Sequence, residues 1–322
     1  MRVLVVTNMY PSDEFPALGT FVKDQAGALR VRGIQIEVLL MKGPKKDRTK
    51  YVRGAVDVLG QVRSRRYDLI HAHYVFSGII ARVQTRYPLL VSFHGGREMV
   101  GWQGILCKML APLVDAVTVT SQVHKKALGR RDAHVIPCGV DFELFRPVSQ
   151  CTARHELGLP QDRRLALFVA ELRPEKRHDI AQKAINLLQE RGENIELLTV
   201  TGHPHNTIPK YLNAGDVLLL TSEHEGSPVV IKEAMACNVP IVSVDVGDVR
   251  EVIGATAGCY VCQRSAEDVA EKVAKVLRTT QRTEGRQAIR HLEVGFLADQ
   301  LVGVYESLLQ KHARTVSQAR RV

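Results

Sequence analysis

Short apolar runs rich in β-branched residues alternate with amphipathic stretches along most of the chain, and this alternation limits the folds that it can adopt. In the first half, apolar runs occupy residues 3–7, 34–41, 69–73, 89–93 and 116–120, and helical patterns occupy 20–32 and 55–65. In the second half, apolar runs at 165–170, 195–201, 217–220 and 241–244 alternate with helical patterns at 179–191, 228–237 and 266–277. Strands separated by helices form parallel sheets, because a parallel connection has to cross over the sheet. We therefore expect an α/β protein with a doubly wound parallel sheet in each half.

The length of the chain suits two such sheets. At 322 residues it is long for a single hydrophobic core and comfortable for two domains of about 150 residues each. The pattern breaks near residues 140–151, where Gly139, Pro147 and polar residues interrupt it. We therefore expect an N-terminal domain at 1–145, a C-terminal domain at 146–295, and a final helix with a basic tail at 296–322.

Composition excludes several classes of protein. No apolar run reaches about 18 residues, so no membrane span is expected, and the apolar start at 1–7 is too short for a signal peptide. These features predict a cytoplasmic protein. The net charge of +10 is compatible with a nucleic acid, an anionic membrane surface or an anionic ligand. With 5% aromatic residues and no nucleic-acid motif, a solvated basic surface or loose attachment to anionic lipid is the better interpretation.

The six cysteines do not form a metal-binding pattern. Cys259 and Cys262 have C-x-x-C spacing, but a zinc site needs a second close pair, and the segment between them also fits a short strand. We expect reduced, structural thiols and no metal site.

One segment, residues 222–236, combines two carboxylates with a helix start. Ser227 suits an N-cap and Pro228 the first helical position, so the helix would begin between Glu225 and Glu233. The N-terminus of a helix binds anions through its backbone N–H groups. Glu233 would lie about 7.5 Å along the axis, at about 1.5 Å per residue. This spacing fits a ligand with a phosphate between hydroxyl-rich groups, such as a nucleotide sugar.

The segment from Glu225 to Glu233 resembles the E-x7-E signature of the family 4 retaining glycosyltransferases. Three further segments, 9–25, 92–96 and 135–147, resemble that family in the same order along the chain. The resemblance implies the GT-B architecture, in which two Rossmann-like domains face each other across a cleft and a C-terminal helix crosses back to the first domain. It also implies that the domain at 1–145 supplies the acceptor side and the domain at 146–295 binds the nucleotide sugar. Residues 10–12 and 19–22 look most like the branch that makes teichuronic acid and other cell-envelope polysaccharides.

The resemblance gives roles to several residues around the donor. Glu233 would accept hydrogen bonds from a ribose diol, and Glu225 would lie beside the transferred sugar, where it stabilises developing positive charge. Lys176 would bind the diphosphate, so that no metal ion is needed. Backbone N–H groups would bind phosphate or sugar oxygens at Gly226, Ser227, Val229 and Val230.

The chain also departs from the family. Glu171 occupies the position where the family usually has an arginine that binds phosphate, and a carboxylate there would repel a diphosphate. Arg173 lies two residues later and could supply the second cation. In the first half, His94 would bind the sugar or the charge near the anomeric carbon, and the backbone N–H of Gly19 would approach the diphosphate.

For four other histidines the sequence gives weaker evidence of a role in the site. His71 and His73 lie on the same side of one strand but lack a third metal ligand, so we expect them to be structural or to face the acceptor. His203 and His205 lie in a proline-containing loop that is expected near the nucleotide base, and we expect no direct role for them. Asp248 follows Gly247 in a loop near the cleft, with no role that the sequence indicates.

Together these features predict a retaining glycosyltransferase that moves a sugar from a UDP-sugar or GDP-sugar to a hydroxyl acceptor without a metal. A lipid-linked acceptor at the inner membrane face would suit a basic protein of the envelope branch. Three alternatives stay open. They are a GT-B enzyme of another reaction, such as a sugar-phosphate synthase, a scaffold subunit that binds sugar nucleotides without turnover, and nucleic-acid binding through the positive charge.

Overall fold

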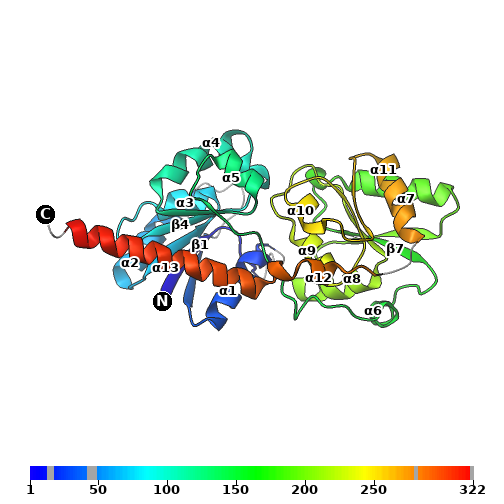
Figure 1. Cartoon of the computed structure of the whole chain (residues 1–322), viewed down its shortest axis with the longest axis horizontal. Coiled ribbons are helices and arrows are strands. Elements are labelled where there is room, and N and C mark those ends of the chain that lie inside the picture. Colours follow the sequence, from blue (N-terminus) through cyan, green and yellow to red (C-terminus); the bar gives the residue numbers. More distant parts are fainter. Residues whose placement is uncertain (13–17, 42–48, 279–281, 320–322) are drawn as a thin grey trace. The chain divides into compact units, whose positions relative to one another are not determined.

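The computed structural model describes residues 1–12, 18–41, 49–278 and 282–319, which form two compact units (Figure 1). Unit 1 contains the described residues of the first 137 positions together with the chain from Val294 onward. Unit 2 contains the described residues from Cys138 to Glu293. Each unit has its own parallel sheet, so the expected α/β fold with two doubly wound sheets is confirmed.

The six-stranded sheet of unit 1 has the strand order β2-β1-β3-β4-β5-β6, with every pairing parallel. Its strands are β1 (Arg2–Thr7), β2 (Gln35–Leu40), β3 (Leu69–His73), β4 (Leu89–Phe93), β5 (Ala116–Val119) and β6 (His134–Val135). β3 and β4 lie in the middle of the sheet, and each is buried along its whole length. Their carboxyl ends are therefore the parts of these strands from which loops reach the surface.

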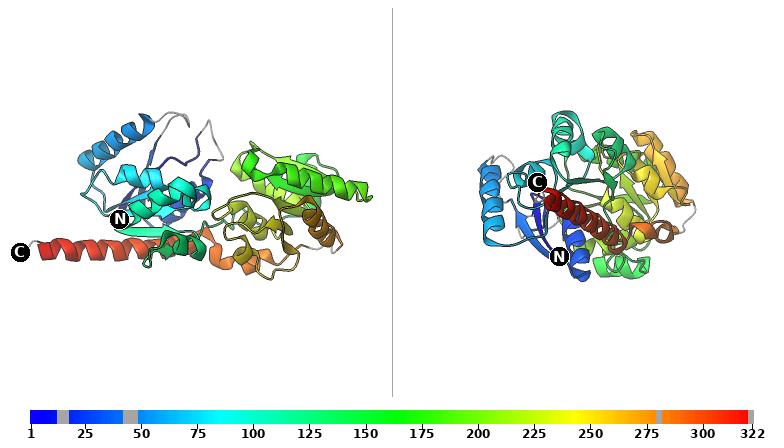
Figure 2. Two further views of the ribbon diagram at one scale, coloured as in Figure 1. Left: turned by 90° about the horizontal axis from the view of Figure 1, so that it is seen from above. Right: turned by 60° about the vertical axis from the view of Figure 1, so that its left-hand side comes forward.

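Helices cover both faces of this sheet (Figure 2). One face carries α1 (Thr20–Val31) and α13 (Val294–Ala319), and the other carries α2 (Thr49–Ser64), α3 (Val75–Ala81), α4 (Gly101–Leu110) and α5 (Gln122–Leu128). Alternate side chains of β1 divide between the two: Val3 and Val5 pack with the first group, and Leu4 and Val6 with the second. This alternation is the period of two that a strand buried on both faces requires.

The last helix of the chain is a structural part of unit 1. α13 packs beside α1, and Tyr305 on α13 is fully buried, with its hydroxyl 2.7 Å from Nδ1 of His71 on β3. The guanidinium of Arg32 also donates to Asp299 at 2.7 Å. The expected basic tail begins within this helix, and Arg320 and Arg321 lie outside the described residues.

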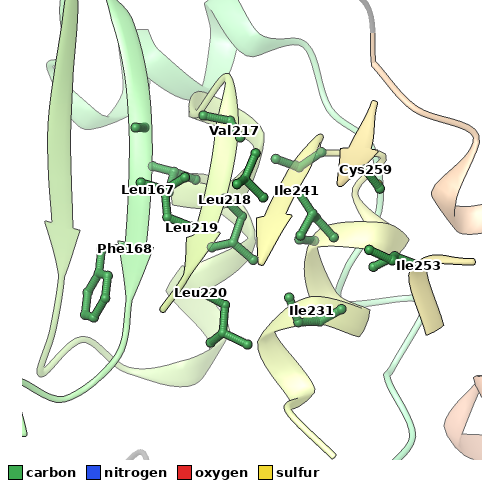
Figure 3. Packing of buried hydrophobic residues seen from close by; sticks show 14 of the residues in the cluster. Leu167, Phe168, Val217, Leu218, Leu219, Leu220, Ile231, Ile241, Ile253 and Cys259 are labelled. Atoms are coloured by element: carbon green, nitrogen blue, oxygen red, sulfur yellow. The ribbon is translucent and has the colours of Figure 1, made fainter. Parts of the chain in front are cut away.

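The five-stranded sheet of unit 2 has the order β11-β10-β9-β7-β8, again parallel. Its strands are β7 (Arg164–Val169), β8 (Ile195–Val200), β9 (Val217–Leu220), β10 (Ile241–Val244) and β11 (Cys259–Cys262). Its helices are α6 (Gln150–Leu157), α7 (His178–Glu190), α8 (Ile208–Ala214), α9 (Val229–Ala236), α10 (Val249–Ile253), α11 (Ala266–Leu277) and α12 (Gly285–Ala288). Figure 3 shows side chains of β7, β9 and β10 packed with Ile231 of α9.

The change from unit 1 to unit 2 falls after Pro137, earlier than the boundary at residue 145 that the sequence indicated. Val140 pairs with Glu293 in an isolated parallel bridge, and its N–H donates to the carbonyl of Leu292 at 3.1 Å. Phe145 is buried in the core of unit 2. The segment after Pro137 therefore belongs to unit 2 because its apolar side chains and its backbone find partners there.

Candidate active site

The helix between the two glutamates begins one residue later than the sequence predicted. α9 starts at Val229 and Pro228 is its N-cap residue, so the predicted cap at Ser227 is wrong. The hydroxyl of Ser227 donates instead to Oδ2 of Asp248 at 2.6 Å, and it also accepts from the ammonium group of Lys232. A hydroxyl held by these two buried groups cannot turn back to cap the helix.

The N-terminus of α9 is consequently left to other partners. No side chain of the described residues caps it. The N–H groups of Val229 and Val230 belong to the first turn, which has no carbonyl of its own helix to bind. Both residues are only half-buried. Their position suits the binding of an anion, as expected for these two backbone donors.

Lys176 and Glu225 lie together in unit 2. Lys176 ends a short 3-10 turn, Pro174–Lys176, that follows β7, and its Nζ is 2.6 Å from Oε1 of Glu225. The two side chains are 17% and 14% exposed. Thr221, directly after β9, donates to the carbonyl of Lys176 at 3.1 Å and so fixes the turn to the end of the neighbouring strand. Two of the expected site residues, from segments 49 positions apart, thus form one charged pair with access to solvent.

Glu233 pairs with a histidine that the sequence analysis set aside. Oε1 of Glu233 lies 2.6 Å from Nε2 of His205, in the 3-10 turn His205–Thr207 beyond the carboxyl end of β8. The ring of Phe145 lies 5.2 Å from that imidazole, centroid to centroid. His205, for which we expected no direct role, thus contacts the glutamate expected to bind the ribose. In the sequence, the indication for His205 is its place in a loop after a strand. Its contact with Glu233 could not be read there, because 28 residues separate the two.

Arg173 is held among carboxylates. Its guanidinium lies 3.4 Å from Glu171 and 3.6 Å from Glu175, and its side chain is half exposed. The carboxylate at position 171 therefore faces the cation expected to replace the family arginine. A diphosphate that recruits Arg173 would have to compete with both acidic side chains.

A buried charged network supports the loop that carries Glu225 and Gly226. Lys232 has 0% exposed side chain, and its Nζ lies 2.9 Å from Oδ2 of Asp248. Asp248 follows Gly247, whose φ of 59° is in the left-handed region and whose missing Cβ leaves room for the carbonyl of Gly226. The sequence analysis missed Lys232 because a lysine on a helix ordinarily faces solvent.

Cys138 extends the same network. Burial raises the pKa of the Cys138 thiol to about 11, and the nearby Lys232, Asp248 and Ser227 also affect that pKa. Oδ1 of Asp248 has no hydrogen-bond partner among the described residues. Ser227 is thus held in place through its side chain, whereas the sequence analysis expected it to contribute a backbone donor to the ligand.

His94 lies in unit 1 within a cluster of rings at the ends of β3 and β4. Its Nε2 is 2.9 Å from Nδ1 of His73, and the two imidazoles stack with centroids 5.2 Å apart. The rings of Phe21 and Tyr74 each lie 4.8 Å from His94. Tyr74 has a φ of 73°, an uncommon conformation for a residue with a Cβ, and such strain clusters at functional sites.

Glu98 holds the backbone beneath this cluster and was not singled out from the sequence. Its buried carboxyl accepts hydrogen bonds from the N–H of His94 at 2.8 Å and of Val75 at 2.5 Å. It therefore joins the loop after β3 to the loop after β4. Burial is the main effect on this group and raises the pKa of Glu98 to about 8.

The same burial keeps three imidazoles neutral. It lowers the pKa of His71 and of His94 to about 3, and it lowers the pKa of His73 well below the usual value. A hydrogen bond between ring nitrogens of His73 and His94 also needs one nitrogen without a proton. Among the described residues, no group of three histidine, cysteine or acidic side chains is arranged to hold a metal ion.

These shifts predict that unit 1 loses stability in mild acid. In the unfolded chain the three histidines take up protons near pH 6.5, whereas in the folded unit they stay neutral. The stability that they contribute to unit 1 is therefore complete above pH 6.5 and declines as the pH falls toward 3. Glu98 has the opposite sign, because its folded form holds a proton more tightly than the unfolded form does. From pH 7.5 to 5.5 we therefore expect the histidines to lower the stability of unit 1 by a few kcal/mol and Glu98 to offset part of that loss.

The net fall in stability can be followed by urea unfolding with the fluorescence of Trp102, the single tryptophan of the chain, which lies in unit 1. The variant Glu98→Gln removes the compensating group, so its stability should fall more steeply than that of the wild type over the same range. Equal pH dependence in the two proteins would contradict this account of the cluster.

Gly19 forms the other expected contact in unit 1. It is the N-cap residue of α1, with a φ of 68°, and a Cβ there would collide with the carbonyl group of Met9. Glycine is therefore required where the chain enters α1. The structure thus groups the expected site residues in two clusters, with Gly19 and His94 in unit 1 and the others in unit 2.

Two family models match the chain, one in each half. A model described as Glycosyltransferase Family 4 matches residues 2–144, and one described as Glycosyl transferases group 1 matches residues 194–279. The first lies mainly on unit 1, and the second contains α9 with Glu225 and Glu233. Together they extend over most of the chain.

Relatives with assigned roles include two bacterial glycosyltransferases. TuaC of Bacillus subtilis (strain 168), assigned to teichuronic acid biosynthesis, is 28% identical over 85% of this chain and 89% of its own length. The D-inositol 3-phosphate glycosyltransferase of Mycobacterium tuberculosis (strain CDC 1551 / Oshkosh) is 26% identical over 68% of this chain and 56% of its own length.

Solved structures share the fold at low sequence identity. Sucrose-phosphate synthase of Thermosynechococcus elongatus has a TM-score of 0.80 at 19% identity, with 97% of this chain and 100% of that chain covered. HepE of Anabaena, solved with UDP-glucose, has a TM-score of 0.71 at 18% identity, with coverage of 95% and 100%. At such identities the likeness shows the fold alone.

Proposed function

This chain belongs to the family 4 and group 1 glycosyltransferases, and we propose that it moves a sugar from a nucleoside diphosphate sugar to a hydroxyl acceptor with retention of configuration. The observation that carries this proposal is the arrangement at α9. An ion pair of Lys176 with Glu225 lies before the helix, and the pair of Glu233 with His205 lies on it. The cation of Lys176 and the N-terminus of α9 suit the diphosphate of a nucleoside diphosphate sugar, and the carboxylate of Glu233 suits its ribose.

In this proposal, unit 2 binds the donor. The carboxylate of Glu233, oriented by His205 at 2.6 Å, accepts hydrogen bonds from the ribose hydroxyls. The N–H groups of Val229 and Val230 bind phosphate oxygens at the positive end of α9. Lys176 turns from Glu225 toward the diphosphate, which leaves that carboxylate beside the sugar ring.

Bond exchange then follows at the anomeric carbon. The acceptor oxygen forms a bond to this carbon while the bond from the carbon to the diphosphate oxygen breaks. The departing oxygen takes the acceptor proton, so no protein base is required. Lys176 stabilises the negative charge on the leaving group and Glu225 the positive charge on the sugar. His94, neutral because of its burial, donates or accepts a hydrogen bond at a sugar hydroxyl.

The donor and acceptor classes rest on relatives. The assignment of TuaC to teichuronic acid synthesis supports a role in cell-envelope polysaccharide or glycolipid synthesis. HepE was solved with UDP and with UDP-glucose, which supports a UDP-sugar, with a GDP-sugar as the other choice. We expect transfer without a metal, because Lys176 supplies the charge, and a lipid-linked acceptor at the inner membrane face. No helix of the described part of the chain is long and apolar enough to cross a bilayer.

A second candidate function is a scaffold subunit that binds sugar nucleotides without transferring the sugar. The contact of Arg173 with Glu171 and Glu175 favours it, because these carboxylates compete with a diphosphate for the cation. Binding of a donor with neither hydrolysis nor transfer would support this candidate. A gain of activity in Glu171→Arg would identify the carboxylate as the cause.

The test of the proposed function is a thermal-shift and calorimetric screen of UDP, GDP, ADP and their sugar conjugates, repeated with EDTA. Selective stabilisation by one nucleoside diphosphate, unchanged by EDTA, is the expected result. A folded protein that binds none of them would refute both the transferase and the scaffold.

Replacement of Glu233 by alanine should weaken binding of that nucleoside diphosphate by about 10- to 100-fold. Hydrogen bonds to a charged group contribute about 1.5–3 kcal/mol each, and the diol would lose its acceptor. Glu251→Ala, which removes an exposed glutamate from α10, is the matched control. Calorimetric dissociation constants that agree between the two variants would show that Glu233 does not contact the ribose.

A further inference from the structure

The exposed face of α4 carries a stripe of large apolar side chains. Trp102, Ile105 and Met109 are 62%, 60% and 62% exposed, and their spacing places them on one side of the helix. The opposite side, with Gly104, Cys107 and Leu110, is buried against the core of unit 1. The helix is therefore apolar on both sides, and only one of these is covered in unit 1.

The stripe continues onto neighbouring segments. Leu113, in the turn after α4, is exposed, and its carbonyl accepts a hydrogen bond at 2.7 Å from Arg82, the residue that follows α3. The ring of Trp102 lies 5.9 Å from that of Phe76 on α3. Ile79 on α3 and Val83, two residues after that helix, are also exposed, and α3 and α4 lie next to each other (Figure 1). The α4 face is defined here as Ile79, Val83, Trp102, Ile105, Met109 and Leu113.

The charged residues of this region are almost all basic. From residue 75 to 114 the chain has four lysines and arginines, Arg82, Arg86, Arg97 and Lys108. Its single acidic residue in this stretch is Glu98, which is buried. Lys108 is exposed on α4 itself, one position before Met109. This stretch therefore has four basic residues against one buried acidic residue, and Asp115, which directly follows it, accepts a hydrogen bond from the N–H of Leu89 at 2.8 Å.

The positive charge of the whole protein is also unevenly divided between its two parts. Residues 1–137 and 294–322 together have 25 lysines and arginines against 12 aspartates and glutamates, a net charge of +13. Residues 138–293 have 19 against 22, a net charge of −3. The positive charge that the sequence analysis noted for the whole protein is thus concentrated in the part that carries the α4 face.

We propose that the α4 face is a docking surface for a bilayer leaflet with anionic headgroups. A tryptophan with aliphatic side chains on one helical face and basic residues beside them is the pattern of a helix that lies in the membrane interface. Basic side chains near the surface are attracted by anionic lipid. A second copy of this chain is a poorer occupant, because it would bring together two surfaces of the same positive sign.

This docking surface deepens the proposed function and rests on it only for the lipid-linked acceptor. α4 has ten residues and so spans about 15 Å, which buries few side chains in the interface. The attachment is therefore reversible and weakens as salt screens the basic residues. It would hold unit 1, which the resemblance connects with the acceptor, at the surface where a lipid-linked acceptor lies.

The experiment measures sedimentation of the full chain with vesicles of neutral phosphatidylcholine and with vesicles containing about one third phosphatidylglycerol. The wild type should bind the anionic vesicles at least about tenfold more strongly, and Trp102→Ser/Ile105→Ser/Met109→Ser should lose at least about tenfold of that binding. Lys108→Glu should lose roughly fivefold or more, since a basic residue near the surface contributes about that factor. The control Val31→Ser/Phe296→Ser removes two exposed apolar side chains from α1 and α13 and should bind as the wild type does.

Three outcomes would overturn the proposal. One is equal binding of the wild type to neutral and anionic vesicles. A second is unchanged binding by the triple variant together with loss of binding in Lys311→Glu/Arg314→Glu, which would move the contact to the end of α13. A third is a self-associating wild type that becomes monomeric in the triple variant with unchanged vesicle binding, which would assign the α4 face to a second copy.

Nucleotide thermal shifts on the same samples separate the two proposals. A triple variant that keeps the shift of the wild type is folded and has an intact donor site, so its loss of vesicle binding is specific to the face. A wild type that binds vesicles but no nucleotide would refute the proposed function and leave the docking surface standing.

Discussion

Lys176→Ala should lower kcat about 100- to 1,000-fold. The diphosphate leaves with additional negative charge, and in the proposed mechanism Lys176 is the side chain that stabilises it. The removal of one such group from a prearranged site costs about 3–4 kcal/mol in the barrier. Folding should change much less, by under about 2 kcal/mol, because both members of the Lys176–Glu225 pair retain access to solvent.

The measurement compares kcat with the midpoint of thermal unfolding. Lys183→Ala, which removes an exposed lysine from α7 in the same unit, is the matched control and should match the wild type in both. A Lys176→Ala protein with full turnover would show that the leaving group is stabilised elsewhere. One that is inactive only because it unfolds would give Lys176 a structural role.

The second large effect concerns stability. Lys232→Met should lower the free energy of unfolding of unit 2 by about 3–5 kcal/mol, because it leaves Asp248 buried without its cation. Asp248→Asn should cost a similar amount by leaving Lys232 without a counter-charge. The double variant leaves no uncompensated charge, so it should be more stable than either single variant.

Calorimetric unfolding of the four proteins tests this coupling. The interaction energy of the cycle is expected to exceed about 2 kcal/mol. Additive losses would mean that the two charges do not depend on each other, against their separation of 2.9 Å. In the single variants we also expect weaker donor binding, because Ser227 and the loop that carries Glu225 lose their support.

Much of the fold follows from local patterns. Three strands, Leu89–Phe93, Val217–Leu220 and Ile241–Val244, have the same bounds as the apolar runs in the sequence. A buried parallel strand is apolar on both faces, so the run and the strand begin and end together. Helices α3 and α4 could not be identified in this way. α4 has apolar side chains on its buried and exposed sides alike, so the period of 3.6 residues is hidden.

The site divides along similar lines. Glu225 and Glu233 are recognisable because their spacing and the helix start between them are local. The partners that act on them are not local: His205 lies 28 residues before Glu233, and Asp248 lies 16 residues after Lys232. Whether a lysine on a helix faces solvent or a buried carboxylate depends on which loop packs on that helix. No pattern within the helix records this.

The pairing of Val140 with Glu293 has a consequence for biosynthesis. Residues 138–293 begin and end side by side, as an insertion in unit 1. A ribosome delivers all of unit 2 before it delivers α13, so unit 2 can complete its core first although unit 1 begins earlier. Until Tyr305 emerges, the face of the six-stranded sheet that α13 covers stays open. A nascent chain of this protein would therefore offer chaperones that apolar face for as long as the last helix takes to be made.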